Sequence, residues 1–447
     1  MATLKNSRSA LRHKQFQLYL SIRFLLSFAA QWQTTVLGFY VYQLTHSKMA
    51  IAFIGLSEVI PAIGMALYGG YITDKSNKRT LLLWSNLALV LVSVGLLAVH
   101  QVVFMIYVLL FVSGFARAFY EPALFAVYTG SVPRSEYAGA ASWNNLSWQV
   151  ASVTGPLAAG FGYALAGRIY PGLSGISLSF IVVSLLLLSS LVLVGRLRVG
   201  IVAGEPAGAV GAAGAGARAG AGEPAGAGDR AGAGAKDGMR ESILAGLRFV
   251  FRTKPLFYAM NLDLFSVFFG GVSALLPVYA LDILKVGAEG LGIMRMVMSA
   301  GAALSMLLAA RLPVMHRPWC SLLIAAGGFG VCVVGFGFSG NFILSLIFLF
   351  GQGAFDSISV LIRSTLLQFF TPAAMRGRVS AVNSMFIASS AEIGDFESGV
   401  MASLLGTVPA VLLGGCITLA VVIFTFTRTG QLVRYSVEEL APAPAME

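Results

Sequence analysis

Residues 80–99 read TLLLWSNLALVLVSVGLLAV, a run that carries no charge and consists mainly of Leu, Val and Ala. A helix of about 20 apolar residues crosses the hydrocarbon core of a bilayer. A strand cannot cross it alone, because its backbone groups would lack hydrogen-bond partners. The run therefore predicts a membrane-spanning helix. The whole chain agrees, since 11% of its residues are charged, against about 25% in a soluble domain.

Comparable apolar runs recur along nearly the whole sequence, and we predict an all-α membrane protein with twelve transmembrane helices. Eleven or thirteen helices are alternatives, because boundaries drawn from hydropathy shift by several residues. The predicted spans are 17–43, 49–73, 80–99, 103–128, 138–166, 174–195, 255–280, 289–311, 318–338, 341–369, 378–405 and 408–427.

The basic residues are distributed unevenly between the two sides of the membrane. With a cytoplasmic N-terminus, inside segments hold 23 of the 30 Lys and Arg residues, and outside loops hold three. Lys and Arg are enriched in cytoplasmic loops, so we predict that both termini are cytoplasmic. This placement also explains the net charge of +11 without nucleic-acid binding.

One segment in the middle of the chain interrupts the apolar pattern. It is nearly all Gly, Ala and Pro with scattered charge, a composition that cannot bury a core and predicts a disordered linker. After it, apolar residues fall on one face of a short basic stretch, which predicts an interfacial amphipathic helix. The predicted organisation is a tail (1–15), a six-helix bundle (16–198), the linker (199–238), the interfacial helix (239–253), a second six-helix bundle (254–428) and a tail (429–447).

The two predicted bundles match each other at a shift of 239 residues. This shift pairs Gly114 with Gly353, Pro133 with Pro372, Asn144 with Asn383 and Gly155 with Gly394. Transporters of the 6+6 kind are built from such parallel repeats, related by an axis along the membrane normal. We therefore predict a pseudo-twofold arrangement of two six-helix halves.

The loop after the second predicted helix reads Gly70-Tyr-Ile-Thr-Asp74-Lys75-Ser-Asn77-Lys78-Arg79-Thr-Leu-Leu82. It resembles the loop signature of the major facilitator superfamily, with Asn77 where a second Gly is usual. Asn tolerates a left-handed turn, so the substitution is expected to be mild. The resemblance implies a cytoplasmic gate in which Asp74 lies against the start of the eleventh helix. The gate set is Gly70, Asp74, Lys75, Lys78, Arg79, Arg376 and Arg378.

Further motifs resemble the bacterial drug- and siderophore-efflux branch of that superfamily, which includes the enterobactin exporter and macrolide efflux proteins. In the first half these are Gly114-Phe-Ala-Arg117 and the Gly155–Pro156 element of the fifth helix, a partial match to the antiporter signature. In the second half they are Thr371-Pro372-Ala-Ala-Met-Arg-Gly-Arg378 and Glu392-Ile-Gly-Asp-Phe-Glu397. The resemblance implies a bacterial inner-membrane exporter.

Charged residues inside the predicted spans are functional candidates, because a charge in hydrocarbon is costly. Arg23, Glu121, Asp263 and Arg363 fall in the cytoplasmic third of the first, fourth, seventh and tenth helices, one on each. The superfamily resemblance implies that these four helices line the central cavity. We predict that these four residues form a charge network bridging the halves and carrying coupling protons. A static structural network is the alternative.

Two further groups of charged residues accompany that set. Arg117 and Asp356 occupy positions related by the 239-residue shift, and Arg117 is also one turn from Glu121, an arrangement in which the two can pair. Glu58 on the second helix is expected, on family geometry, to lie against Glu392 and Asp395 of the eleventh helix. Either of these two acids is a candidate to carry a proton or to pair with a cation.

The sequence contains no nucleotide-binding loop, metal-ligand spacing or nucleophile motif, so we expect neither an enzyme nor a cofactor or bound metal. The leading interpretation is a monomeric proton antiporter that exports a small amphipathic drug or siderophore. An importer or lysolipid flippase of the same fold, or a non-transporting membrane sensor, are the alternatives. Aromatic residues near the cavity helices favour an amphipathic substrate: Phe24, Trp32, Phe119, Tyr120, Tyr258, Phe265 and Phe355.

Overall fold

The computed structural model describes residues 9–169, 174–197, 237–309, 316–372 and 375–434, and within them the chain is almost entirely helical. The long helices are α2 (Lys14–Thr45), α3 (Lys48–Lys75), α4 (Lys78–Val99), α5 (Val103–Gly130), α6 (Tyr137–Ile169), α7 (Gly175–Arg196), α8 (Asp237–Arg252), α9 (Lys254–Gly270), α11 (Gly287–Ala309), α12 (Pro318–Phe338), α13 (Phe342–Phe370), α14 (Arg376–Leu405) and α15 (Thr407–Thr429). The predicted all-helical architecture is thereby confirmed for the described residues.

Nine helices in the described part of the chain are long and apolar enough to cross a membrane, judged by length and composition. The helices α2, α6 and α14 are not among them, although they have 32, 33 and 30 residues. These three carry more polar side chains, including Arg23, Asn144 and Asp395. Together with the nine, they coincide with the twelve predicted spans. The predicted linker lies outside the described residues, except for its last two positions.

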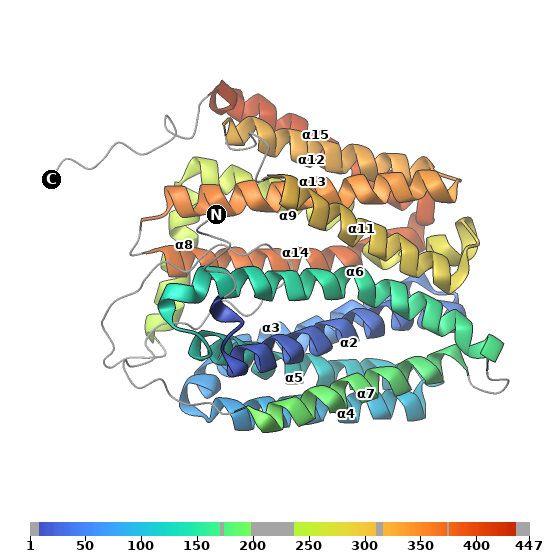
Figure 1. The fold of residues 1–447 in the computed structure, drawn as a ribbon. Helices are drawn as coiled ribbons and strands as arrows, with labels where there is room; N and C mark the ends of the chain where they lie inside the picture. The colour runs from blue at the N-terminus through green and yellow to red at the C-terminus, as the bar shows by residue number, and fades with distance from the viewer. Residues whose placement is uncertain (1–8, 170–173, 198–236, 310–315, 373–374, 435–447) are drawn as a thin grey trace. The chain divides into compact units, whose positions relative to one another are not determined.

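The chain divides into two compact units. Unit 1 comprises Met1–Ala215 and Ala274–Met296, and unit 2 comprises Gly216–Ser273 and Val297–Glu447. In unit 1, α2 packs against α6 and α7, α3 packs against α5, and α4 packs against α5 and α7. Figure 1 shows α4 and α7 running alongside each other. Large apolar side chains fill the contacts between these helices, among them Ile22, Leu96 and Phe180.

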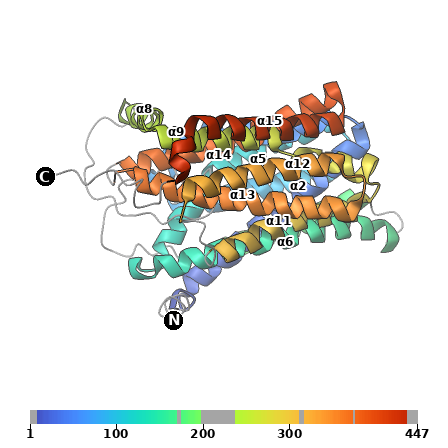
Figure 2. The same ribbon diagram turned by 90° about the horizontal axis from the view of Figure 1, so that it is seen from above.

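Unit 2 repeats this pattern of packing. Here α9 packs against α14 and α15, and α12 packs against α13 and α15. Figure 2 shows α12 running alongside α13. The core contains Trp319, Leu322 and Ile362. The amphipathic helix α8 contacts α9 and α14 and lies crosswise to them (Figure 1). Its Val250 is buried, whereas Phe251 is exposed.

Two pairs of glycines related by the 239-residue shift make equivalent helix crossings. A Cβ on Gly114 would overlap the carbonyl oxygen of Glu58, and a Cβ on Gly353 would overlap that of Met298. In the second pair, a Cβ on Gly155 would lie 3.4 Å from the Phe28 carbonyl oxygen. One on Gly394 would lie 2.8 Å from the Phe268 carbonyl oxygen. Each unit therefore brings helix backbones together at the same places, as small residues allow in membranes.

Two local features differ from the sequence expectations. Asn77 is not in a left-handed turn, because its φ is −67° and its side chain instead caps α4 by accepting a hydrogen bond from the Arg79 backbone N–H. The predicted span 255–280 is not one continuous helix. It stops at Gly270 and resumes through the 3₁₀ turn η2 (Ser273–Leu275), α10 (Leu276–Val278) and the π-helical turn η3 (Tyr279–Ile283).

Candidate functional site

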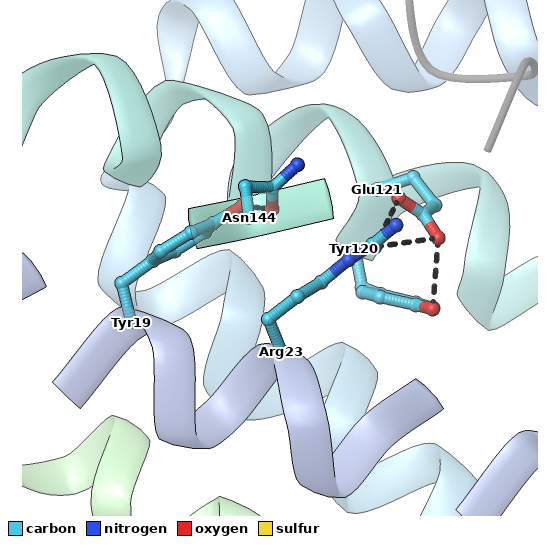
Figure 3. Close-up of polar contacts among 5 residues, drawn as sticks. All are labelled: Tyr19, Arg23, Tyr120, Glu121 and Asn144. Carbon is cyan, nitrogen blue, oxygen red and sulfur yellow. Dashed lines mark hydrogen bonds and ion pairs between the residues drawn. The ribbon is translucent and has the colours of Figure 1, made fainter. Parts of the chain in front are cut away.

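An ion pair between the buried Arg23 and the half-buried Glu121 joins α2 to α5 in unit 1. Arg23 is only 8% exposed, and its Nη1 lies 3.1 Å and 3.4 Å from the two carboxylate oxygens of Glu121 (Figure 3). The Tyr120 hydroxyl donates a hydrogen bond to the same carboxylate at 2.9 Å. Among the described residues, the Arg23 Nε has no hydrogen-bond partner. The Arg23 guanidinium thus pairs with Glu121 through Nη1, and its Nε–H can still donate a hydrogen bond.

A second polar contact lies one turn away on the same face of α2. The Tyr19 hydroxyl donates to Asn144 Oδ1 on α6 at 2.6 Å, as Figure 3 shows. The Tyr19 ring packs against Phe16 and Tyr128, with ring centroids 5.9 Å and 5.5 Å apart. Aromatic packing and the hydrogen bond together fix the α2–α6 contact beside the ion pair.

Replacing Tyr19 by Phe is expected to lower the thermal stability of the purified protein. The change keeps the ring packing but leaves Asn144 Oδ1 without its donor, at a cost of about 1 kcal/mol. Thermal unfolding in detergent measures the effect. Tyr68→Phe is the matched control, because the Tyr68 ring is largely exposed. Equal stability of Tyr19→Phe and Tyr68→Phe would contradict the prediction.

A second acid in unit 1, Glu58, is neutralised across the α3–α5 crossing. Glu58 Oε1 lies 3.1 Å from Arg117 Nη2 and accepts a hydrogen bond from the Ser113 hydroxyl at 3.1 Å. This contact is adjacent to Gly114, whose missing side chain lets α5 approach the Glu58 backbone. Arg117 therefore pairs with Glu58 and Glu121 pairs with Arg23, a choice of partners that the one-turn spacing of Arg117 and Glu121 did not predict.

Unit 2 contains its own buried pair, between Asp263 on α9 and Arg363 on α13. The two residues are 6% and 3% exposed, and the Arg363 guanidinium contacts the Asp263 carboxylate. Asn383 and Ser390 of α14 and the Phe386 ring line the same small hollow. Asn383 and Asn144 are related by the 239-residue shift. Each unit therefore has an Asn, on α6 or on its repeat mate α14, near an Arg–carboxylate pair.

The four predicted cavity charges thus form two pairs, each inside one unit. The charges are reversed between the units: the first-half pair has its cation on α2, whereas the second-half pair has its anion on α9. A network that bridges the halves stays a prediction. Tyr19 was absent from the predicted set, although the same shift pairs it with Tyr258 and could have revealed it. Asp356, predicted as the mate of Arg117, is half-buried on α13.

Most of the predicted gate lies outside what the structure describes. The side chains of Asp74, Arg376 and Arg378 are outside the described set, and so are the surroundings of Gly70. Of the remainder, Lys75 is exposed and Lys78 is half-buried. The Arg79 guanidinium donates to the carbonyl oxygen of Gly195, at the C-terminal end of α7. Positive charge is favourable at that end of a helix. The gate therefore stays a prediction.

The remaining predicted residues lie on α6 and α14. The α6 helix continues through Pro156, and a Cβ on Gly155 would come within 2.8 Å of Gln31 Cβ on α2. Glu392 and Asp395 are half-buried on α14. Their predicted contact with Glu58 is untested.

The comparisons with known proteins agree with this fold. The Major Facilitator Superfamily profile matches residues 19–395 of this chain. No curated protein sequence matches it.

Several solved transporters share the fold at low sequence identity. The nucleoside transporter NupG has a TM-score of 0.65 at 12% identity, over 95% of this chain and 100% of that one. A bacterial homologue of the human lysosomal transporter Spinster gives 0.61 at 15% identity, over 97% and 100%. A POT family transporter in complex with 5-aminolevulinic acid gives 0.68 at 12% identity, over 94% and 96%. With the profile match over most of its length, this multi-pass membrane chain belongs to the major facilitator superfamily of transporters.

Proposed function

We propose that the chain is a secondary active exporter that moves a small amphipathic drug or siderophore in exchange for protons by alternating access. The observation that carries the proposal is the presence of one Arg–carboxylate pair with a buried Arg in each unit, Arg23–Glu121 and Asp263–Arg363. Buried ion pairs add little net stability, because desolvation offsets their attraction. Their presence inside membrane helices favours a functional role.

The chemistry of these pairs suits proton exchange. Protonating Glu121 or Asp263 removes the negative charge that holds the neighbouring guanidinium, and deprotonation restores it. Burial and a neighbouring Arg act in opposite directions on the proton affinity of a carboxyl group. A conformational change that alters both can therefore load and release a proton. We place the protein in the bacterial inner membrane with both termini cytoplasmic, an orientation supported by the distribution of Lys and Arg.

Flux in proteoliposomes under an imposed proton gradient tests the proposal, with a panel of drugs and siderophores as substrates. We expect substrate to move against its own gradient and opposite to the protons, and a protonophore to abolish this movement. Flux in the same direction as the protons would indicate an importer, and movement of lysolipid would indicate a flippase. Binding without flux would indicate a sensor. Each of these three results contradicts proton-coupled export.

A further inference from the structure

The seventh spanning stretch is interrupted in the middle of its apolar sequence. Helix α9 ends at Gly270, and Gly271 is extended, with φ −69° and ψ 110°. The chain resumes helical structure only at Ser273, although Lys254–Ile283 is one apolar stretch. The last four carbonyl groups of a helix have no partner within it. In hydrocarbon, such groups need partners from the protein or from a ligand.

Side chains from two other helices of unit 2 reach this break. Gln352 Nε2 on α13 donates to the Gly270 carbonyl oxygen at 3.3 Å. The Ser398 hydroxyl on α14 donates to the Gly271 carbonyl oxygen at 2.8 Å. Gln352 and Ser398 are buried. These two hydrogen bonds therefore stabilise the non-helical backbone at Gly270 and Gly271.

Gln352 and a second buried residue, Ser266, have oxygen atoms near the break that can accept a ligand. The Gln352 amide must direct its NH₂ group at Gly270, because a carbonyl oxygen can only accept. Its Oε1 is buried and has no hydrogen-bond partner among the described residues. The same holds for the hydroxyl of Ser266, which lies one turn before Gly270 on α9. Both are acceptors inside the bundle.

One carboxylate completes the cluster. A Cβ on Gly271 would lie 3.5 Å from Asp395 Oδ1, so the carboxylate of α14 lies beside the extended backbone. The C-terminal end of α9 adds partial negative charge of its own. Among the described residues, the cluster thus combines the Asp395 carboxylate with neutral carbonyl, amide and hydroxyl oxygens.

This combination selects a hard monovalent cation. Carboxylate and carbonyl oxygens suit hard cations, and Ca²⁺ takes about six to eight oxygen ligands, more than the groups gathered here. Transporters with broken helices use unwound carbonyls and helix C-terminal ends to coordinate Na⁺ or a proton. We propose that the break between α9 and η2 is a Na⁺-binding site formed by the carbonyl groups at Gly270 and Gly271, Gln352 Oε1, the Ser266 hydroxyl and Asp395. The site goes beyond the proposed export, because Na⁺ binding here requires neither substrate nor a proton gradient.

Binding is tested on the purified full-length protein in detergent, without any transport measurement, so that this inference and the export proposal can fail separately. Thermal unfolding is followed as NaCl replaces choline chloride or KCl at constant ionic strength. We expect a saturable rise of the midpoint in Na⁺ that choline and K⁺ do not reproduce. Equal midpoints in all three salts would overturn the proposal. A midpoint that responds to pH alone would also overturn it, in favour of a proton site.

Variants of the site sharpen this test. Asp395→Asn is expected to abolish the Na⁺ response. Ser398→Ala, which releases the Gly271 carbonyl from its donor, is expected to weaken Na⁺ binding roughly 10- to 100-fold, as when groups supporting metal ligands are removed. Ser403→Ala, on the same helix but exposed, is expected to respond like wild type. If Asp395→Asn does not fold, the comparison of Ser398→Ala with Ser403→Ala decides, measured by radioactive sodium binding. Equal sodium affinity of these two variants would refute the site.

Discussion

Asp263→Asn is expected to lower the stability of the protein by about 3 to 5 kcal/mol and to abolish proton-driven flux. The substitution removes the negative charge that neutralises Arg363, which is only 3% exposed. An uncompensated buried charge carries a cost of this order. Thermal unfolding in detergent measures the first effect, and proteoliposome flux under a proton gradient measures the second.

The double variant Asp263→Leu with Arg363→Met separates a structural role from a coupling role. Replacing both members of a buried pair by apolar residues of similar size is often neutral for stability. We expect the double variant to recover the midpoint of the wild type while remaining unable to couple flux to protons. Wild-type proton dependence in this variant would show that the pair is only structural. An unchanged midpoint in Asp263→Asn would contradict the stability prediction.

Gly114→Ala is expected to destabilise unit 1 by about 1 to 3 kcal/mol, the usual cost of overpacking. The new methyl group would overlap the Glu58 carbonyl oxygen, and a backbone atom cannot rotate away. Gly353→Ala should have a similar effect in unit 2, because it meets the Met298 carbonyl in the same way. Thermal unfolding of the two single variants and their combination measures these losses.

Gly64→Ala is the matched control for the glycine crossings. Gly64 lies inside α3, and a Cβ there would meet no group from another part of the described chain within 4 Å. Ala favours a helix over Gly by about 1 kcal/mol, so this variant should be neutral or slightly more stable. If Gly114→Ala were as stable as Gly64→Ala, the α3–α5 crossing would not depend on the missing side chain.

Hydropathy predicted the helices well because lipid and core exclude polar residues over the whole length of a span. The prediction 318–338 coincides with α12, and 80–99 begins two residues after the start of α4. The break at Gly270–Gly271 escaped prediction, because both glycines fit an apolar run and hydropathy carries no information on φ and ψ. The break depends on polar partners from other helices, because Gln352 and Ser398 donate to the carbonyl groups of Gly270 and Gly271.

The charged residues of the candidate site were predicted, but their partners were not. The spacing along α5 favoured an ion pair between Arg117 and Glu121. In the structure, Arg117 pairs with Glu58 and Glu121 pairs with Arg23. The choice depends on how each helix is rotated about its axis, which residues distant in sequence determine. Tyr19 was not predicted for a related reason. A Tyr is common in an apolar helix, and its role depends on the hydrogen bond from its hydroxyl to Asn144, which the sequence does not reveal.

The glycine crossings also bear on how two copies of one ancestral bundle can diverge in chemistry. Gly114 contacts the backbone of an acid, Glu58, and Gly353 contacts the backbone of an apolar residue, Met298. A carbonyl oxygen is present whatever side chain follows it, so the crossing tolerates either residue. After a gene duplication, one half could therefore lose or gain a charge at this position while keeping its architecture. Where backbone contacts maintain the helix crossings, the side chains at these positions can change, and substrate specificity can change with them.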